Sequence, residues 1–360
     1  MKKLRVAIIG IAHIHVKTLT PVFHRMSDVY EIVGIADVPP YTEEEYQIRL
    51  KLNMPDNIEL KIWDDYKELL RQNIDIAVIC TDIKGHADIV EEVLSMDIHA
   101  VVEKPMTLSM ADAKRMYRAH KASKAELIIN WPIAWFPSFR KAKELADSGI
   151  IGDVIRVHYR SPATCGPYIP DNHPKDELAK LWWYRGDRGG GSICDYAGYG
   201  CVLSTWITGK TAKRVAGMSK RFILDFADCE DYSAFTIDFG DAIGLIEGSW
   251  STLSNGEIPT GPVIFGKKGV IVADRFSPRV KVYTNFIPYV PTPEPNAVYD
   301  CEPISEDIAK NIAEFILDGK PLYEMVTADF NMKVMAALDA GRKSCESGNI
   351  EKAEEPFEEE

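Results

Sequence analysis

The fold is decided by the stretch that runs from residue 4 to residue 15, Leu-Arg-Val-Ala-Ile-Ile-Gly-Ile-Ala-His-Ile-His. Its first six residues are mostly apolar and end at Gly10, and an amphipathic stretch then runs from residue 13 to residue 26. A buried strand, a tight turn and a helix in this order are typical of the first unit of a dinucleotide-binding domain. Only the first glycine of a G-x-G-x-x-G pattern is present, so the context carries this interpretation.

Apolar runs continue through the first 130 residues and alternate with helix-like stretches. The runs occupy residues 4–9, 31–36, 58–63, 76–80, 100–103 and 127–130. The stretches between them include 87–95 and 109–122. Mostly apolar strands that alternate with helices indicate a parallel sheet covered on both faces. We therefore predict a doubly wound α/β domain of the Rossmann type over residues 1–130.

From residue 153 onward the pattern changes to short strand-like runs, at 154–159, 214–218, 233–239, 243–250, 263–265 and 269–272. Helices are expected near 137–148, 192–208, 305–318 and 326–345, and residues 305–345 are expected to pack back on the first domain. The proline-rich segment 286–304 is expected to be a surface loop. The pattern predicts an α+β domain with a largely antiparallel, open sheet over residues 131–350, followed by a solvated acidic tail over 351–360.

Composition excludes several classes of partner. A chain of 360 residues that is 46% apolar suits two domains with sizeable cores. The net charge of −12 argues against nucleic acid, which needs a basic surface, and no run has the roughly 18 apolar residues of a membrane helix. Seven scattered cysteines without a C-x-x-C pair indicate reduced thiols. These thiols favour a cytoplasmic location. We expect no metal, because His158 and His173 lack the spacing of metal ligands.

The first turn is a candidate site for the cofactor's phosphates. Gly10 allows the sharp turn, and Ala12 is small enough to keep the backbone close to a pyrophosphate. The backbone N–H groups of His13 and Ile14 would then bind the phosphates at the start of the helix. We interpret the side chains of His13 and His15 as surface or packing groups.

The second strand-like run ends at Asp37, where a carboxylate suits the ribose hydroxyls of an adenosine. It would also repel the 2′-phosphate of NADP, at a cost of about 1 kcal/mol in water and about 4 kcal/mol at an effective dielectric near 20. No lysine or arginine occurs in residues 38–41 to offset this charge. The sequence therefore predicts that NAD is preferred over NADP.

Two further strand ends carry polar residues on the ligand-binding edge of a parallel sheet. Thr81 follows the fourth run and His86 starts the next helix, where it either lines the nicotinamide ribose or serves only as a helix-start residue. The fifth run delivers Glu103-Lys104-Pro105. The proline favours extended geometry at Lys104, which can then point its side chain into the crevice. A plain surface lysine is the alternative.

The segment from Gly189 to Tyr199 contains three consecutive glycines, then Asp195. Asp195 and Tyr199 are four residues apart, so they share one face of the expected helix. Alcohol oxidation needs a proton acceptor beside the hydride acceptor, and a nearby Lys104 ammonium would lower the pKa of the Tyr199 phenol. Asp195 would orient Lys104 or bind a substrate hydroxyl. Either Lys104 or Tyr199 carries the proton, unless Tyr199 only packs in the domain seam.

Aromatic and polar residues concentrate between residues 161 and 188. Aromatic faces with polar tips suit a sugar or cyclitol, although some of the tryptophans fill the domain junction in the alternative interpretation. The expected substrate-binding residues are Asn130, Trp131, Tyr168, His173, Trp183 and Arg185.

These residues resemble the Gfo/Idh/MocA oxidoreductases, the group of glucose–fructose oxidoreductase and inositol dehydrogenase. The resemblance spans about residues 4–345 and rests on Gly10, Asp37, Thr81 with His86, the Glu103-Lys104-Pro105 tripeptide, the triple glycine and Asp195. It implies an NAD-dependent enzyme that interconverts C–OH and C=O on a sugar, sugar derivative or cyclitol. It also implies that the second domain mediates a homodimer or homotetramer through its open sheet face.

The chain departs from the group in three places. Its glycine-rich loop is reduced, Tyr199 stands where many members have histidine, and the Asn130-Trp131 region lacks the arginine of an Asn-x-Arg-Phe run. The latter two departures motivate a second hypothesis, a redox-neutral lyase or glycoside-cleaving enzyme with tightly bound NAD. The reduced loop motivates a third, a non-catalytic dinucleotide-binding protein.

Overall fold

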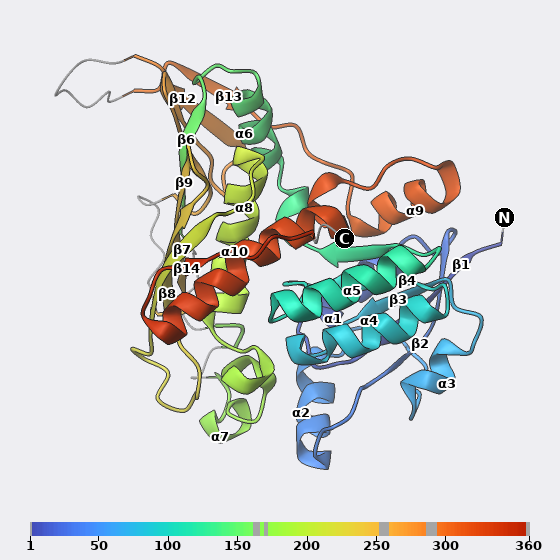
Figure 1. Ribbon diagram of the computed structural model, residues 1–360. Coiled ribbons are helices and arrows are strands. Elements are labelled where there is room, and N and C mark those ends of the chain that lie inside the picture. Colours follow the sequence, from blue (N-terminus) through green and yellow to red (C-terminus); the bar gives the residue numbers. More distant parts are fainter. Residues whose placement is uncertain (1, 161–165, 169–171, 252–258, 286–293, 358–360) are drawn as a thin grey trace.

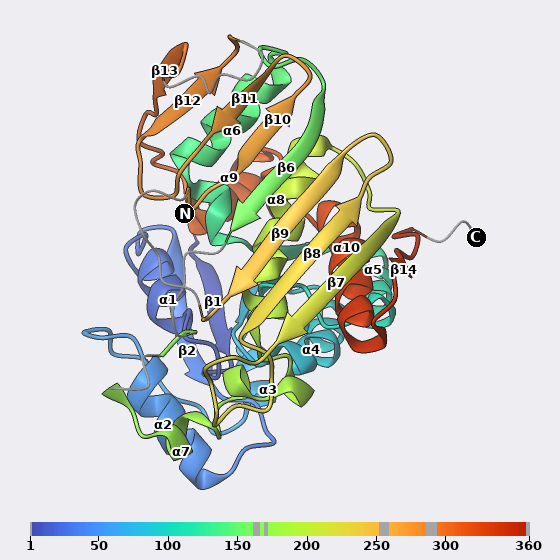
Figure 2. The same ribbon diagram turned by 90° about the vertical axis from the view of Figure 1, so that its left-hand side faces the viewer.

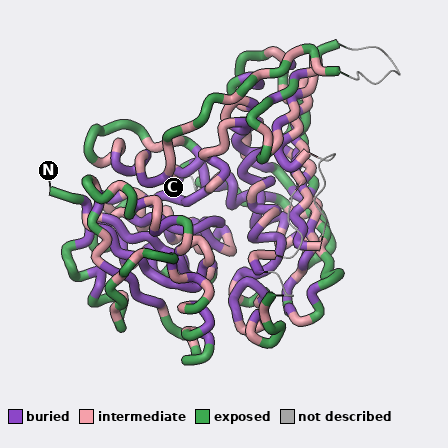
Figure 3. The backbone as a smooth tube through the Cα atoms, turned by 180° about the vertical axis from the view of Figure 1, so that it is seen from behind, coloured by how far each residue is buried: buried purple, intermediate pink, exposed green. Residues whose placement is uncertain are grey.

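The computed structural model describes residues 2–357 except 161–165, 169–171, 252–258 and 286–293. In these ranges the chain forms a five-stranded sheet and a nine-stranded sheet, each with its own helices (Figure 1). Buried backbone runs through the interior of both halves, and exposed segments lie mostly at the outer loops (Figure 3). Of the helices in these ranges, none combines the length and the hydropathy that a membrane span requires.

The first sheet is parallel and has the strand order β2-β1-β3-β4-β5. Its strands are β1 (Leu4–Ile9), β2 (Tyr30–Ala36), β3 (Ile76–Ile79), β4 (His99–Glu103) and β5 (Leu127–Asn130). Every residue of β3 and β5 is buried, as expected for strands that are covered on both faces. The predicted Rossmann-type fold is confirmed.

Helices cover this sheet (Figure 1). They are α1 (Val16–His24), α2 (Glu43–Asn53), α3 (Tyr66–Leu70), α4 (His86–Ser95) and α5 (Met110–Ala122), with a 3₁₀ turn η1 (Ile83–Gly85) before α4. Local sequence fixes their starts. Thr42 and Glu45 form a reciprocal capping box at α2, and the Ser109 side chain accepts a hydrogen bond from Asp112 N at α5.

One predicted strand of this domain is wrong. Residues 58–63 form only an isolated bridge, between Ile62 and Ile35, instead of a strand. Ile62 is 48% exposed, so the run buries too little apolar surface to hold a full place at the sheet edge.

The second sheet has the order β13-β12-β11-β10-β6-β9-β8-β7-β14 and is antiparallel apart from the β6–β9 pair. Its strands are β6 (Val154–Arg160), β7 (Arg214–Lys220), β8 (Tyr232–Asp238), β9 (Ile243–Ser249), β10 (Val263–Gly266), β11 (Gly269–Val272), β12 (Arg279–Tyr283), β13 (Ala297–Asp300) and β14 (Glu351–Lys352). The predicted α+β fold with a largely antiparallel sheet is confirmed. In Figure 2 one face of this sheet points toward the viewer, with α6, α8 and α10 behind it.

The helices of the second half are α6 (Pro137–Asp147), α7 (Lys175–Leu178), α8 (Gly198–Thr208), α9 (Ile308–Asp318) and α10 (Ala328–Ser347). Short turns are η2 (Pro132–Trp135), η4 (Trp182–Tyr184), η5 (Gly186–Arg188), the π-helical η6 (Ile193–Ala197) and η7 (Glu324–Val326). Helix α10 contacts α5 and β5 of the first half as well as β7 and α8 of the second. It therefore lies across the boundary between the two domains, which we call the seam (Figure 1).

Two C-terminal expectations need correction. Within the predicted loop 286–304, residues 286–293 lie outside the described part, but Ala297–Asp300 form β13 and pair with β12. The acidic tail does not simply extend into solvent: Glu351–Lys352 pair with β7, and Ala353 is buried. Edge pairing of this kind uses backbone groups, so a charged sequence gives little sign of it.

Candidate active site

The candidate site lies where the carboxyl ends of the parallel strands meet the second domain. Gly10 ends β1 with φ +91°, and a Cβ placed there would lie 2.6 Å from Thr81 Cγ2 and 2.9 Å from the Cys80 backbone. Only glycine therefore lets this turn pass so close to the end of β3. The turn brings residues 11–15 against β4 and the second domain.

A buried ion pair joins the two domains at this point. Lys104, directly after β4, donates a hydrogen bond to Asp195 Oδ1 on η6. The second oxygen, Asp195 Oδ2, accepts a hydrogen bond from Trp250 Nε1 at 2.9 Å. Lys104 is 2% exposed and Asp195 8% exposed, so solvent screens their attraction little. The predicted lysine and carboxylate are thus in direct contact.

Tyr199 lies beside this pair, but one expectation about it is wrong. Lys104 Nζ lies 4.8 Å from the centre of the Tyr199 ring, over its aromatic face. The pKa of Tyr199 is well above its ordinary value, because burial penalises the phenolate and the Asp195 and Glu103 carboxylates add to the penalty. Lys104, which is paired with Asp195, does not reverse this shift. At neutral pH Tyr199 is a neutral phenol.

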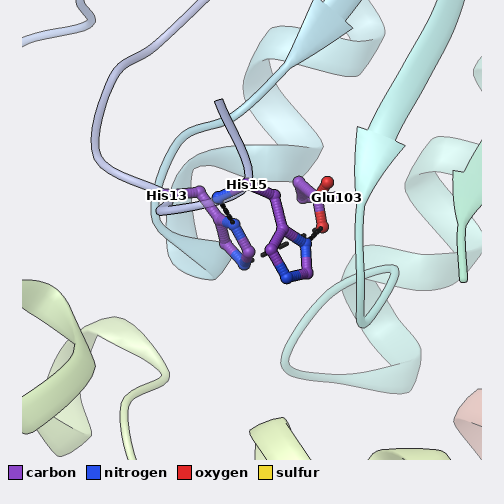
Figure 4. A group of neighbouring side chains, drawn as sticks. All are labelled: His13, His15 and Glu103. Carbon is purple, nitrogen blue, oxygen red and sulfur yellow. Dashed lines mark hydrogen bonds and ion pairs between the residues drawn. The ribbon is translucent and has the colours of Figure 1, made fainter. Parts of the chain in front are cut away.

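Glu103 is the centre of a second buried network. Its Oε1 accepts a hydrogen bond from Asn130 Nδ2 at 2.8 Å, and its Oε2 lies 2.8 Å from His15 Nδ1 (Figure 4). Burial alone would raise the pKa of Glu103, but the interactions with His15, Asn130 and Lys104 outweigh it and hold this pKa below its usual value. The carboxylate therefore ties the first turn to β4 and β5.

His13, His15 and Glu103 also offer three possible metal-ligand atoms, all within 4.8 Å of one another (Figure 4). Hydrogen bonding assigns their protons. The His15 backbone N–H donates to His13 Nδ1 at 3.1 Å, so a neutral His13 carries its proton on Nε2. His15 Nδ1 carries a proton because it faces the ionised Glu103. Both nitrogens that face Glu103 are then donors rather than ligands, and the absence of a metal stays a prediction.

Several buried polar atoms in this seam have no hydrogen-bond partner among the described residues, including His13 Nε2, His86 Nε2 and Trp183 Nε1. Burial holds the pKa of His13 well below its ordinary value and lowers that of His86, so both rings are neutral. His86 Nδ1 donates to the Met106 carbonyl at 3.1 Å, which leaves Nε2 as an acceptor. Unpaired buried donors and acceptors fit a bound dinucleotide, whose phosphates, hydroxyls and carboxamide would complete them.

The adenosine end fits as well. A cavity of about 400 Å³ is lined by Ala12, Asp37, Thr81 and Ile89, among others. Asp37 Oδ1 accepts a hydrogen bond from the Ile11 backbone N–H at 3.0 Å, and Asp37 Oδ2 accepts one from Arg49 at 2.9 Å. Ile14 is partly buried just beyond this turn.

The predicted substrate-binding residues do not all gather in one place. Trp183 lies beside Lys104, with 5.8 Å between Nζ and the ring centre. Trp131 packs edge-on against Tyr199 and donates to Asn331 Oδ1, so it forms the wall behind the phenol. Asn130, as described above, is engaged by Glu103.

The other predicted substrate contacts lie toward the first turn and the 400 Å³ cavity. Tyr168 donates a hydrogen bond to Asn53 Oδ1, and its ring contacts that of His173. Arg185 lines the 400 Å³ cavity and pairs with Asp187. Parts of the aromatic stretch, 161–165 and 169–171, lie outside the described residues.

Sequence reasoning missed Trp250, Arg49 and Glu230. Trp250 directly follows β9, and a polar-tipped aromatic at a strand end was the only available signal. Glu230 accepts a hydrogen bond from the Ile193 backbone N–H at 2.8 Å, behind the triple glycine. Gly191 has φ +105°, a conformation that favours glycine, so the backbone geometry beside Glu230 explains one glycine of the three.

Comparisons with known proteins agree with this arrangement. A model described as "Oxidoreductase family, NAD-binding Rossmann fold" matches residues 4–131, and one described as "GFO/IDH/MocA C-terminal domain" matches residues 139–272. The chain is 27% identical over 166 residues to myo-inositol 2-dehydrogenase of Thermotoga maritima. This aligned region covers 44% of this chain and 46% of the relative. It is 29% identical over 167 residues to D-xylose 1-dehydrogenase [NADP(+)] of Haloarcula marismortui, covering 46% and 44%. The match thus spans less than half the length of these relatives.

Solved structures show the same fold over nearly the whole chain. The aldose-aldose oxidoreductase from Caulobacter crescentus complexed with glycerol has a TM-score of 0.73 at 19% identity, covering 98% of this chain and 100% of that one. The WlbA dehydrogenase from Bordetella pertussis, in complex with NADH and UDP-GlcNAcA, has a TM-score of 0.72 at 18% identity, covering 98% and 99%.

Proposed function

Because the chain belongs to the GFO/IDH/MocA family of NAD-binding oxidoreductases, we propose that it interconverts C–OH and C=O on a sugar, sugar derivative or cyclitol. The observation that carries this proposal is the buried Lys104–Asp195 pair at the carboxyl edge of the parallel sheet. An ion pair at this edge, close to unpaired buried polar atoms, suits proton transfer next to a bound dinucleotide better than it suits a structural role.

When bound, the cofactor would accept a hydride at its nicotinamide C4 atom in alcohol oxidation and return it in carbonyl reduction. The backbone of residues 10–14 would hold its phosphates, while Thr81 and His86 would line its nicotinamide ribose. Asp37 supports NAD as the preferred form, since a carboxylate at the end of β2 accepts hydrogen bonds from ribose hydroxyls. Glu103 holds the turn at 13–15 in place through His15.

Lys104 is the proposed proton carrier. Its Nζ gives a proton to the substrate oxygen when a carbonyl is reduced and takes one back when an alcohol is oxidised. Asp195 orients Nζ, and Trp250 fixes Asp195. Tyr199 has its pKa raised by burial, so it serves as a neutral hydrogen-bond donor instead of the base. The rings of Trp183 and Tyr199 beside Nζ offer the faces against which a sugar ring packs.

Oligomerisation is proposed through the sheet face shown in Figure 2. Met218, which is 65% exposed, lies there with Tyr232 and Leu245 in the lining of a cavity of about 740 Å³. An apolar face of this kind favours a homodimer or homotetramer.

The test is a screen of sugars, sugar acids and cyclitols with NAD, followed by absorbance of the reduced nicotinamide. We expect at least one polyol to give turnover that is lost in Lys104→Met, while an exposed lysine variant, Lys67→Met, retains it. Turnover that survives in Lys104→Met would overturn the assignment of Lys104.

A second candidate is redox-neutral chemistry with NAD that stays bound. Trp182 of the second domain donates to the Ala12 carbonyl at 2.9 Å, and Tyr168 reaches Asn53, whose side chain donates to Ile11 O. These contacts fasten the first turn beneath the second domain and would slow cofactor exchange. NAD that remains stoichiometric after gel filtration, with product release and no free NADH, would favour this candidate.

A further inference from the structure

The carboxylate at the end of β2 is already neutralised. Arg49 on α2 donates to Asp37 at 2.9 Å, and both side chains are nearly inaccessible to solvent. Arg49 lies twelve positions after Asp37, beyond residues 38–41, in which the sequence has no lysine or arginine. The repulsion that an isolated Asp37 would exert on a 2′-phosphate is therefore largely cancelled.

Pairing of carboxylates with arginines extends over the whole cavity of about 400 Å³ beside Asp37, which we call the adenosine cavity. The carboxylates that line it all have an arginine partner, with separations between 2.7 and 3.4 Å. The pairs are Asp37–Arg49, Asp82–Arg188, Asp88–Arg115 and Asp187–Arg185. Arg115 also pairs with Glu91 and Asp112, so Asp88 is only partly compensated, whereas Asp37 has Arg49 as its partner.

One of these arginines approaches the loop that follows Asp37. Arg188, on η5 of the second domain, donates to the Pro40 carbonyl at 3.4 Å and lies 3.4 Å from Asp82. Both contacts are long, so the guanidinium loses little energy when it turns to a better acceptor, and Asp82 is then left without its arginine partner. Arginine binds phosphate through two parallel N–H donors, and an arginine near this loop is how a dinucleotide fold accommodates a 2′-phosphate.

We propose that this protein binds NADP as well as NAD, with Arg188 receiving the 2′-phosphate and Arg49 cancelling the charge of Asp37. The inference rests on the proposed function for the class of cofactor. We expect the affinity for NAD to exceed that for NADP by less than about tenfold. An uncompensated carboxylate would make this ratio up to roughly a thousandfold.

The test compares binding of ADP and 2′,5′-ADP to the full chain by calorimetry, without any substrate. We expect both to bind, with dissociation constants within about tenfold of each other. If ADP binds and 2′,5′-ADP binds more than roughly a hundredfold more weakly, the inference fails and the proposed function stands. If neither nucleotide binds, the proposed function fails as well.

Variants assign the effect to the two arginines. Arg188→Gln and Arg49→Gln should each weaken 2′,5′-ADP by about tenfold, with ADP changed less than about threefold. Arg49→Lys keeps the charge and should restore much of the binding. Asp37→Asn should strengthen 2′,5′-ADP relative to ADP.

The matched control is Arg214→Gln, which removes an exposed arginine–aspartate pair on the second sheet. It should leave both nucleotides unchanged. Arg188 is less buried than Arg49, so its variant remains informative if Arg49→Gln does not fold. An unchanged ratio of the two dissociation constants in Arg188→Gln would overturn the role of Arg188.

Discussion

Two buried ion pairs lie at opposite ends of the candidate site, and they form in different ways. Asp37 and Arg49 are twelve residues apart and belong to one domain, so the first domain can assemble their contact alone. Lys104 and Asp195 are 91 residues apart and belong to different domains. Their contact exists only when both domains are folded and docked.

The difference separates binding from chemistry. The local pair shapes the end of the site that recognises the adenosine, while the pair across the seam supplies the groups for proton transfer. A buried ion pair returns little net stability, but losing one partner leaves an uncompensated charge that costs about 3–5 kcal/mol. Both pairs should therefore be sensitive to mutation, with different readouts.

The largest expected effect comes from breaking the pair across the seam. Lys104→Met should lower kcat by about a thousandfold, because proton transfer is lost, and should destabilise the fold by roughly 3–5 kcal/mol through the unpaired Asp195. ADP affinity should change less than about threefold, because its cavity belongs to the other pair. Steady-state kinetics, urea unfolding and calorimetry measure the three quantities. A large loss of ADP affinity would show that the two ends are not separate.

Neutralising the two carboxylates sharpens the comparison. Asp195→Asn removes the charge and can keep only one of the two accepted hydrogen bonds, because its Nδ2 is a donor and would face either Lys104 or Trp250. We expect kcat to fall by about a hundredfold with KM for NAD nearly unchanged. Asp37→Asn should show the reverse, with KM for NAD raised by about tenfold and kcat nearly unchanged. The same direction of change in both variants would contradict the division of roles.

A further carboxylate, the partly buried Glu230, shows what happens without a cation. No ion pair of Glu230 occurs in the described ranges, and burial raises its pKa from 4.5 to about 7. Because the folded state binds this proton more tightly than the unfolded state, stability falls as pH rises from 4.5 to 7 and is then constant. The loss is roughly 3 kcal/mol from this group. Glu230→Gln should remove it, which unfolding curves at pH 5 and pH 8 would reveal; an equal pH dependence in both proteins would refute the assignment.

The smallest effect is expected at Trp250, which contacts the Lys104–Asp195 pair through one hydrogen bond. Trp250→Phe removes the hydrogen bond to Asp195 Oδ2 but keeps most of the ring, so kcat should fall about threefold to tenfold. A matched change, Trp206→Phe, alters a tryptophan that packs near Tyr323 and should leave kcat unchanged. A null result for Trp250→Phe would show that Lys104 alone orients Asp195.

Sequence by itself determined the elements, because strand and helix periodicity, capping residues and glycine turns act over a few neighbouring residues. It therefore identified the parallel sheet, the antiparallel sheet and the strand end at Lys104. It also singled out Asp195 and Tyr199 through their four-residue spacing. The strand predicted over residues 58–63 was wrong, because alternation of apolar and polar residues does not show whether a segment pairs with a neighbouring strand.

Only the tertiary structure decided the partners and therefore the charge states. Arg49 reaches Asp37 from the next helix, Trp250 reaches Asp195 from the residue after β9, and His15 reaches Glu103 across the sheet edge. Burial, which no spacing rule reports, keeps Tyr199 a neutral phenol. Desolvation and Coulomb energies depend on separation in space, and the distance between two residues along the chain does not set that separation.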